Sequence, residues 1–212
     1  MNSIFKITSN QVDYDHSLPF AARVTDDVMA GTCFCCTLPT QRTVLLTNAH
    51  VVESAHRGEV CISREHQGLG PVAGVRVLMM CPQLDIALLD TSKLSNAKPL
   101  ALSARTPRAA HRVNMSGYPL ASQRLRTSSG CVDGAYHDAS GTYFNIAGSI
   151  NHGNSGGPVT CATTGEVLGI ACATLADSEA LSLAVPIRAV LAAIAEWEAQ
   201  GVSRLLRLPT LN

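Results

Sequence analysis

Short apolar runs, separated by glycine, proline, serine and asparagine, recur along most of this sequence. Runs of this length between turn residues are typical of β-strands, and many of them at regular intervals indicate a barrel or a sandwich. The pattern predicts strands at Gly31–Leu38, Thr43–Thr47, Glu59–Ser63, Val72–Met80, Ile86–Asp90, Val113–Tyr118, Gly130–Tyr136, Thr142–Ile146, Gly157–Cys161, Val167–Thr174 and Ser182–Pro186. Thr163, Thr164 and Gly165 predict a hairpin turn between two of these strands.

Two segments depart from this β pattern. Apolar residues between Ile187 and Gln200 repeat at helical spacing, which predicts a helix that packs on the last β unit rather than one that binds a partner. The residues on its apolar face are Val190, Leu191, Ile194 and Trp197. The polar, proline-containing segment Ser103–His111 is the expected linker between two β units.

Composition narrows the classes of protein and of partner. Hydrophobic residues make up 46% of the 212 residues and 16 basic residues offset 16 acidic ones, so disorder and a general basic surface for nucleic acid are both disfavoured. No apolar run approaches the ~18 residues of a membrane span. Met1–Ser17 lacks the apolar centre of a secretory signal, and we therefore expect a cytoplasmic protein without membrane or nucleic-acid partners.

The eight cysteines are expected to be reduced and mostly buried, because this composition and length need no disulfides. A zinc site is the alternative, but the spacing of these residues does not form standard CxxC pairs. Its candidate ligands are Cys33, Cys35, Cys36, His56, Cys61 and His66. Since small apolar residues would suit the same strand positions, we expect neither a metal nor a cofactor.

Three segments contain residues that could carry chemistry: LLTNAHVV with His50, DIALLD with Asp85, and NHGNSGGP with Ser155. Each alone has an ordinary explanation as a loop, turn or strand end. Together they supply a nucleophile, a base that titrates near neutrality, and a carboxylate that can orient the base. Glycines beside Ser155 leave its hydroxyl accessible, and the amides of Gly153 and Ser155 could hold an oxyanion.

The order of these residues separates the folds that use such a triad. The stretch from Gly153 to Gly157 fits the G-x-S-x-G motif of α/β-hydrolases, but those enzymes need a histidine after the serine, and the last histidine here is His152. Subtilisins have the order Asp, His, Ser within an alternating α/β pattern that this sequence lacks. The order His, Asp, Ser in a β-rich chain is that of chymotrypsin.

The motifs TNAHVV, DIALL and GNSGGP, with LGIA at Leu168–Ala171 and LAVPI at Leu183–Ile187, resemble those of trypsin/chymotrypsin-fold serine proteases, and most of all the HtrA/Deg-type proteases. The resemblance implies an all-β fold of two antiparallel β-barrels with a C-terminal α-helix. Residues 1–105 would form the barrel with His50 and Asp85, residues 106–186 the barrel with Ser155, and residues 187–212 the helix and tail. The segment after Ile187 is too short for a PDZ domain, so the resemblance covers the protease domain only.

The resemblance also implies residue roles. Ser155 is the nucleophile, His50 the general base and then acid, and Asp85 the residue that orients His50; Asp90 is a weaker alternative for the acid. The walls of the specificity pocket would be formed by Ser149, Ile150, Asn151, Cys172, Ala173, Thr174, Ser182 and Leu183, with His152 at the rim. Since none of these is acidic, a small or medium apolar residue is expected at P1, unless Asp177 or Glu179 folds inward and favours a basic one.

Three departures from the family pattern shape the expected function. Asn154 stands where digestive relatives have an acid, which argues against activation by N-terminal cleavage, and Val51 stands where secreted relatives have a disulfide cysteine. Cys172 takes the position of a hydroxyl that supports the catalytic acid, and a thiol is a weaker donor.

The leading hypothesis is a serine endopeptidase acting on protein or peptide, with a possible activating partner or oligomer. The alternatives are a latent or non-catalytic module that binds a peptide or a partner protein, and an esterase or acyltransferase.

Overall fold

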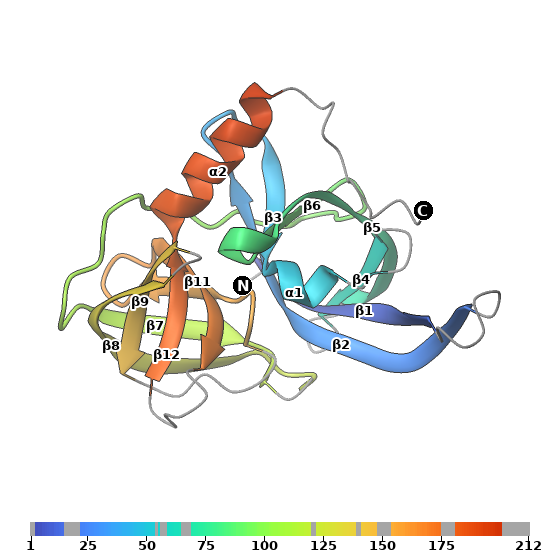
Figure 1. Cartoon of the computed structure of the whole chain (residues 1–212), viewed down its shortest axis with the longest axis horizontal. Helices are drawn as coiled ribbons and strands as arrows, with labels where there is room; N and C mark the ends of the chain where they lie inside the picture. Colours follow the sequence, from blue (N-terminus) through green and yellow to red (C-terminus); the bar gives the residue numbers. More distant parts are fainter. Residues whose placement is uncertain are drawn as a thin grey trace.

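Two closed antiparallel β-barrels lie side by side, and one long helix packs against them (Figure 1). The computed structural model describes residues 3–14, 22–53, 55, 59–64, 69–119, 122–138, 141–147, 154–174 and 181–200. The described part of the chain supplies six strands to each barrel, which confirms the predicted fold class. No helix within it has both the length and the apolar character needed to cross a membrane.

The first barrel has the strand order β1-β2-β3-β6-β5-β4 and closes where β1 pairs with β4. Its elements are β1 (Ile4–Tyr14), β2 (Ala22–Thr37), β3 (Thr43–Thr47), α1 (Ala49–Val52), β4 (Glu59–Arg64), β5 (Leu69–Cys81), the 3-10 helix η3 (Pro82–Leu84) and β6 (Ile86–Leu89). The second barrel has the order β10-β11-β12-β9-β8-β7 and closes between β7 and β10. Its elements are β7 (Arg112–Gly117), β8 (Arg126–Asp138), β9 (Gly141–Ala147), β10 (Pro158–Cys161), β11 (Val167–Thr174) and β12 (Leu181–Pro186), followed by α2 (Ile187–Ala199).

The burial of the strands explains why apolar and polar residues alternate in some strands, whereas other strands are apolar along their length. In β4 and β7 buried residues alternate with more exposed ones, as expected where one strand face meets solvent. In β6 all four residues are buried, and in β3 all but the first. On β6, Leu89 packs inside the first barrel, whereas Leu88 packs into a second cluster that also holds residues of the other barrel. β6 therefore has a buried environment on both of its faces.

This second cluster, hereafter the shared cluster, joins both barrels and the helix α2. The first barrel contributes Ile4, Phe34, Cys36, Leu38, Val44, Leu46, Met79, Ile86 and Leu88, and the rest of the buried set is Tyr118, Tyr143, Val167, Ile170, Cys172, Leu183, Val185, Ile187, Val190 and Ile194. The predicted apolar face of the helix is confirmed, with Leu191 and Trp197 partly buried beside these residues. Thr40, in the turn before β3, adds a hydrogen bond from its hydroxyl to Glu198 at 3.2 Å. The helix therefore contacts both barrels, and not only the last one.

The connection between the barrels is longer than the predicted linker and is tied to both of them. It runs from the end of β6 to the start of β7, over residues 90–111. The Leu100 amide donates to the Cys35 carbonyl at 2.8 Å, and the Ser103 amide donates to the Val167 carbonyl at 2.9 Å. The chain thus passes from the first barrel to the second within a few residues.

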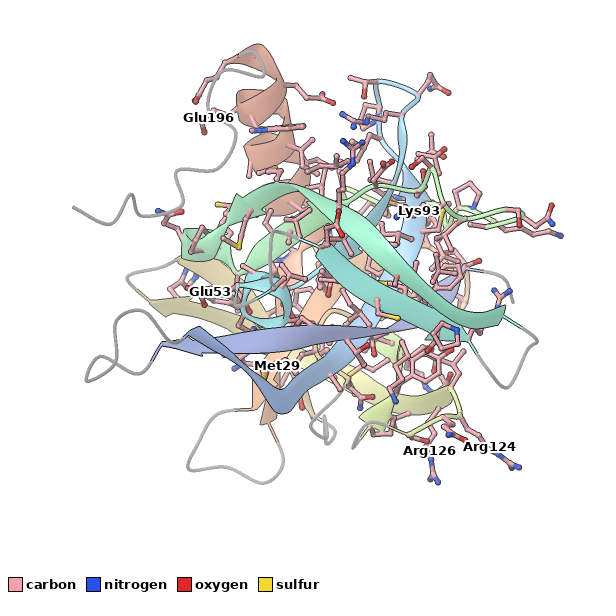
Figure 2. All side chains as sticks on the ribbon, turned by 90° about the vertical axis from the view of Figure 1, so that its right-hand side faces the viewer. Met29, Glu53, Lys93, Arg124, Arg126 and Glu196 are labelled. Carbon is pink, nitrogen blue, oxygen red and sulfur yellow. The ribbon has the colours of Figure 1, made fainter. Side chains whose placement is uncertain are left out.

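Figure 2 shows Arg124 and Arg126 pointing outward at the edge of the second barrel, far in that view from Glu196 on α2.

The shared cluster leads to a prediction for stability. Ile194 on α2 is 2% exposed, so Ile194→Ala leaves a cavity between the helix and the barrels and should cost about 2–5 kcal/mol of unfolding free energy. Arg188→Ala, at an exposed position on the same helix, is the control and should change this free energy by less than about 0.5 kcal/mol. Urea unfolding followed by circular dichroism measures both. Equal stability of the two variants would mean that α2 is not held through Ile194.

Candidate active site

Strand register brings His50 and Asp85 together. Thr47 near the end of β3 pairs with Ala87 near the start of β6. His50 follows Thr47 by three residues in α1, and Asp85 precedes Ala87 by two residues at the end of η3. Two side chains distant in the sequence therefore lie at the same end of one strand pair.

The His50 ring and the Asp85 carboxylate are in direct contact. His50 Nδ1 lies 2.8 Å from Oδ2 and 3.0 Å from Oδ1 of Asp85, and the His50 backbone amide donates to Oδ1 at 3.0 Å. The side-chain amide of Asn48 donates to the Asp85 carbonyl at 2.7 Å. Because an ionised carboxylate only accepts hydrogen bonds, Nδ1 carries the proton and a neutral ring keeps its lone pair on Nε2. The His50 side chain is 39% exposed, so a bound molecule could reach it.

Asp85 has an uncommon backbone conformation, with φ at 52° in the left-handed region. Aspartate and asparagine adopt this region more readily than most residues. The local turn is closed by the Asp85 amide, which donates to the Pro82 carbonyl at 3.1 Å. The tight turn of η3 thus fixes the backbone position of Asp85, from which the carboxylate side chain extends.

Asp90, the alternative acid, lies at the other end of β6. Its carboxylate accepts a hydrogen bond from the Ser92 hydroxyl at 2.7 Å and pairs with Arg76 at 3.1 Å. Burial alone would raise the pKa of Asp90, but the hydrogen bonds from Ser92 and Arg76 outweigh it and lower that pKa. The structure therefore pairs His50 with Asp85 and places Asp90 in a separate ion pair.

Ser155 lies in a tight turn that is fixed by backbone hydrogen bonds. The Gly157 amide donates to the Asn154 carbonyl at 2.9 Å, and the Gly156 amide donates to the Ala171 carbonyl of β11 at 2.8 Å. Gly156 has φ at +83°, and a Cβ there would collide with the Thr32 carbonyl and the Thr47 hydroxyl. A glycine at position 156 is therefore required both by the backbone conformation and by the close approach of the first barrel.

This turn meets the first barrel beside the segment that carries His50. The Thr32 amide on β2 donates to the Ser155 carbonyl at 2.8 Å. Next to it, a Cβ built on Gly31 would lie 2.8 Å from Val51, the neighbour of His50, and 3.1 Å from the Ser155 carbonyl oxygen. Ser155 and the histidine segment therefore flank the same glycine of β2, one from each barrel.

The Ser155 hydroxyl itself donates to the Cys172 carbonyl on β11 at 3.3 Å. Among the hydrogen bonds between described residues, none joins this hydroxyl to His50. Catalytic hydrogen bonds are often long or misaligned in a free enzyme and tighten when a substrate binds. The three candidate residues thus lie near one junction of the barrels, with only the histidine–aspartate contact formed.

The structure describes part of the expected specificity pocket. The Cys172 thiol donates to the Leu183 carbonyl at 3.3 Å, and Ser182 is fully buried on the neighbouring strand β12. The backbones of Ala173 and Thr174 pair with Leu183 and Ser182. The positions outside the described residues are Gly153 of the expected oxyanion hole, the wall residues Ser149, Ile150 and Asn151, the rim residue His152, and Asp177 and Glu179.

Two buried threonines at this junction were missed by the sequence reasoning. The Thr47 hydroxyl donates to the Thr32 carbonyl at 2.8 Å, and the Tyr118 amide of the second barrel donates to the Thr32 hydroxyl at 3.0 Å. Thr32 thereby links the Ser155 turn, β3 and Tyr118. A buried polar residue points to such a role, but the sequence shows only a threonine in an apolar strand, and nothing there reveals its burial.

The cysteines differ in their surroundings. None of the eight forms a disulfide; five are buried, Cys61 and Cys81 are half-buried, and Cys131 is exposed. Cys33 and Cys35 pack inside the first barrel while Cys36 faces the shared cluster, so the three candidate zinc ligands on β2 do not share one side of the strand. His56 and His66, the histidines of that alternative, lie outside the described residues. Across the described positions, no three histidine, cysteine or acidic side chains gather as a metal site would require.

The chain is similar to several proteins that are named as proteases. The Synechocystis sp. protein named serine protease HhoA is 29% identical over 153 residues, which cover 68% of this chain and 37% of that protein. The chain thus spans little more than a third of that relative's length. Among solved structures, the active form of the Rv3671c protease from M. tuberculosis matches with a TM-score of 0.72 at 23% identity, covering 92% of this chain and 80% of that one.

The HtrA-type protease AlgW, solved with a tripeptide, matches with a TM-score of 0.73 at 18% identity over 93% of this chain and 60% of its own. These likenesses confirm the chymotrypsin-type fold, which this chain shares with solved HtrA-type proteases. The sequence model described as "Trypsin-like peptidase domain" matches residues 31–170, most of the chain and all three candidate residues. The chain belongs to the trypsin-like peptidase domain family.

Proposed function

We propose that this chain is a serine endopeptidase that hydrolyses peptide bonds through Ser155, His50 and Asp85. The observation that carries the proposal is the contact of His50 Nδ1 with both Asp85 oxygens, at 2.8 and 3.0 Å, beside the turn that holds Ser155. This contact leaves Nε2 as the basic atom of a half-exposed ring. A base in that state is what a weakly nucleophilic serine hydroxyl needs.

In the proposed reaction the Ser155 hydroxyl turns from the Cys172 carbonyl toward His50 as a peptide enters. Nε2 takes the hydroxyl proton while Oγ bonds to the scissile carbonyl carbon, and the Asp85 carboxylate stabilises the imidazolium that forms. The amides of Ser155 and Gly153 would hold the oxyanion. His50 then gives its proton to the leaving amine, and water releases the acyl group by the same route in reverse.

The substrate is proposed to be a protein or peptide with a small or medium apolar residue at P1. The support is chemical: the described pocket residues Cys172, Ser182 and Leu183 are uncharged, and the Cys172 thiol donates to the Leu183 carbonyl. These described residues offer no counter-ion to a P1 arginine or lysine. AlgW, an HtrA-type protease of the same fold, was solved with a tripeptide.

Covalent labelling tests the proposal. We expect a fluorophosphonate probe to label Ser155 alone, as mapped by mass spectrometry, because the probe requires an activated serine. A peptide panel that differs only at P1 should then be cleaved after Val, Ala, Leu or Met and not after Arg or Lys. Cleavage of simple esters without cleavage of any peptide amide would instead indicate an esterase or acyltransferase.

A latent or peptide-binding module is the second candidate, and it rests on the Ser155 hydroxyl being engaged with the Cys172 carbonyl at 3.3 Å. A serine held in this way is not offered to a base. Absence of labelling in a folded chain would favour this candidate. Labelling that starts only when a partner protein is added would show that the serine is activated by that partner.

A further inference from the structure

Cys161 differs from the other buried cysteines in what surrounds its sulfur. Cys33, Cys35 and Cys36 lie in apolar clusters, where burial raises their pKa, for Cys35 to about 11, and keeps the thiols protonated. Cys161 is also buried, at 5% exposure, and it belongs to the apolar cluster inside the second barrel, but it ends β10, where the strand meets the turn of Thr163, Thr164 and Gly165. These turn residues are exposed to solvent.

Two polar side chains converge on the Cys161 sulfur. His111 Nε2 lies 3.3 Å from Sγ, and the Thr163 hydroxyl lies 3.1 Å from it. The two come from different segments, His111 from the segment before β7 and Thr163 from the β10–β11 turn. Hydrogen bonds lower the pKa of Cys161 to about 5, with the Thr163 side chain as the largest cause, and the Thr164 backbone and His111 as further causes. A sulfur that accepts such hydrogen bonds is stabilised as the thiolate, which is the reactive form of cysteine.

The turn is built so that these donors stay in place. The Gly165 amide donates to the Cys161 carbonyl at 2.9 Å, and the Cys161 amide donates to the Glu166 carbonyl at 2.8 Å. Gly165 has φ at +74°, and a Cβ there would meet open space. The other charged groups around the turn are Glu166, whose carboxylate accepts from the Thr164 hydroxyl at 3.0 Å, and Arg112, which is exposed and whose carbonyl accepts from the Ala162 amide at 3.0 Å.

We propose that Cys161, with His111 and Thr163, forms a reactive-thiol site on the second barrel that hydrogen peroxide oxidises to a sulfenic acid. In this step the thiolate sulfur attacks one peroxide oxygen, an S–O bond forms as the O–O bond breaks, and the sulfur loses two electrons to the peroxide. The departing hydroxide takes a proton from solvent and leaves as water. Peroxide is a small oxidant, and the turn residues beside the sulfur are exposed to solvent. The site is separate from Ser155, so it stands whether or not the chain is a peptidase.

The test treats the full folded chain with hydrogen peroxide near pH 6, traps sulfenic acid with dimedone, and maps each of the eight cysteines by mass spectrometry. We expect dimedone on Cys161 in preference to Cys131, which is the more exposed thiol. Alkylation of Cys161 by iodoacetamide should be nearly as fast at about pH 6 as at pH 8, since a thiol with a pKa near 5 is already ionised. Modification of Cys131 without modification of Cys161 would overturn the proposal.

A matched pair of variants tests whether the Thr163 hydrogen bond, and not only the solvent accessibility of the sulfur, makes Cys161 reactive. Thr163→Val keeps the shape of the exposed turn residue but removes its hydroxyl, and should slow Cys161 alkylation near pH 6 by about two- to tenfold. Thr163→Ser keeps the hydroxyl and should retain the wild-type rate. Equal rates in the two variants would show that Thr163 does not stabilise a thiolate. If Thr163→Val failed to fold, the wild-type pH dependence would decide by itself.

Discussion

Ser155→Ala is expected to lower kcat/KM for a cleaved peptide by about 10⁴- to 10⁶-fold while the protein remains folded. The alanine cannot form the acyl-enzyme, and only the oxyanion donors and substrate binding remain to assist water. Folding should survive because the lost Ser155 hydrogen bond to the Cys172 carbonyl is long, at 3.3 Å, and the Thr32 contact uses the Ser155 backbone. Initial rates with a fluorogenic peptide measure the loss.

Ser129→Ala is the matched control for this substitution. Its hydroxyl donates to Asn114 at 2.8 Å on an exposed part of the β7–β8 ladder, and its removal should leave kcat/KM within about twofold. A peptidase activity that survives in Ser155→Ala would contradict the proposed nucleophile. Loss in both variants would point to misfolding, and a thermal melt of each variant checks this.

Asp85→Asn is expected to lower kcat by about 10⁴-fold with little change in the fold. An asparagine can turn its NH₂ toward His50 Nδ1, which would move the ring proton to Nε2 and remove the base. Asparagine also tolerates the φ of 52° at position 85, so the backbone is not strained, whereas an alanine would be. Steady-state rates on the peptide cleaved by the wild type measure the effect.

Asp90→Asn is the control, since it changes the same chemical group at the other end of β6. That substitution weakens a surface pair with Arg76, whose side chain is 68% exposed, and should cost at most about 1 kcal/mol of stability and leave kcat nearly unchanged. A large loss of kcat in Asp90→Asn and none in Asp85→Asn would reverse the two assignments.

Apolar patterning predicted most strands, because a barrel strand with one face inward leaves a pattern that the sequence shows directly. It did not predict β1, whose residues after Ile7 are largely polar. Nor did it predict that β2 begins at Ala22 and not at Gly31. The pairing of β1 with β2, which continues from Ile4 and Phe34 to Tyr14 and Ala22, defines both. Pairing between distant segments is a tertiary property that local pattern does not contain.

The candidate residues were found from motifs, and their chain order selected the fold. The contact of His50 with Asp85 follows from the β3–β6 register, which no single motif contains. Thr32 escaped notice because its role comes from the Ser155 carbonyl, the Thr47 hydroxyl and the Tyr118 amide, which belong to three separate segments. Cys161 was predicted only to be one of eight reduced and mostly buried cysteines, since the polar groups around it come from a turn and from His111, 50 residues away. The residue types in a sequence indicate which chemistry a site could perform. The chemistry that it does perform depends on the burial of those residues and on their contacts with residues distant in the sequence.

The shared cluster also affects the order in which parts of the molecule can fold during synthesis. The first barrel has an interior of its own, centred on residues such as Ile7, Leu45 and Ile62, and an emerging chain can collapse around it early. Among the described residues, its other buried surface, with Phe34 and Leu46, packs with residues of the second barrel and with Val190 and Ile194 of α2. On the ribosome that surface stays exposed until the second barrel and the helix have emerged. The junction between His50 and Ser155 therefore forms only after the first barrel has collapsed.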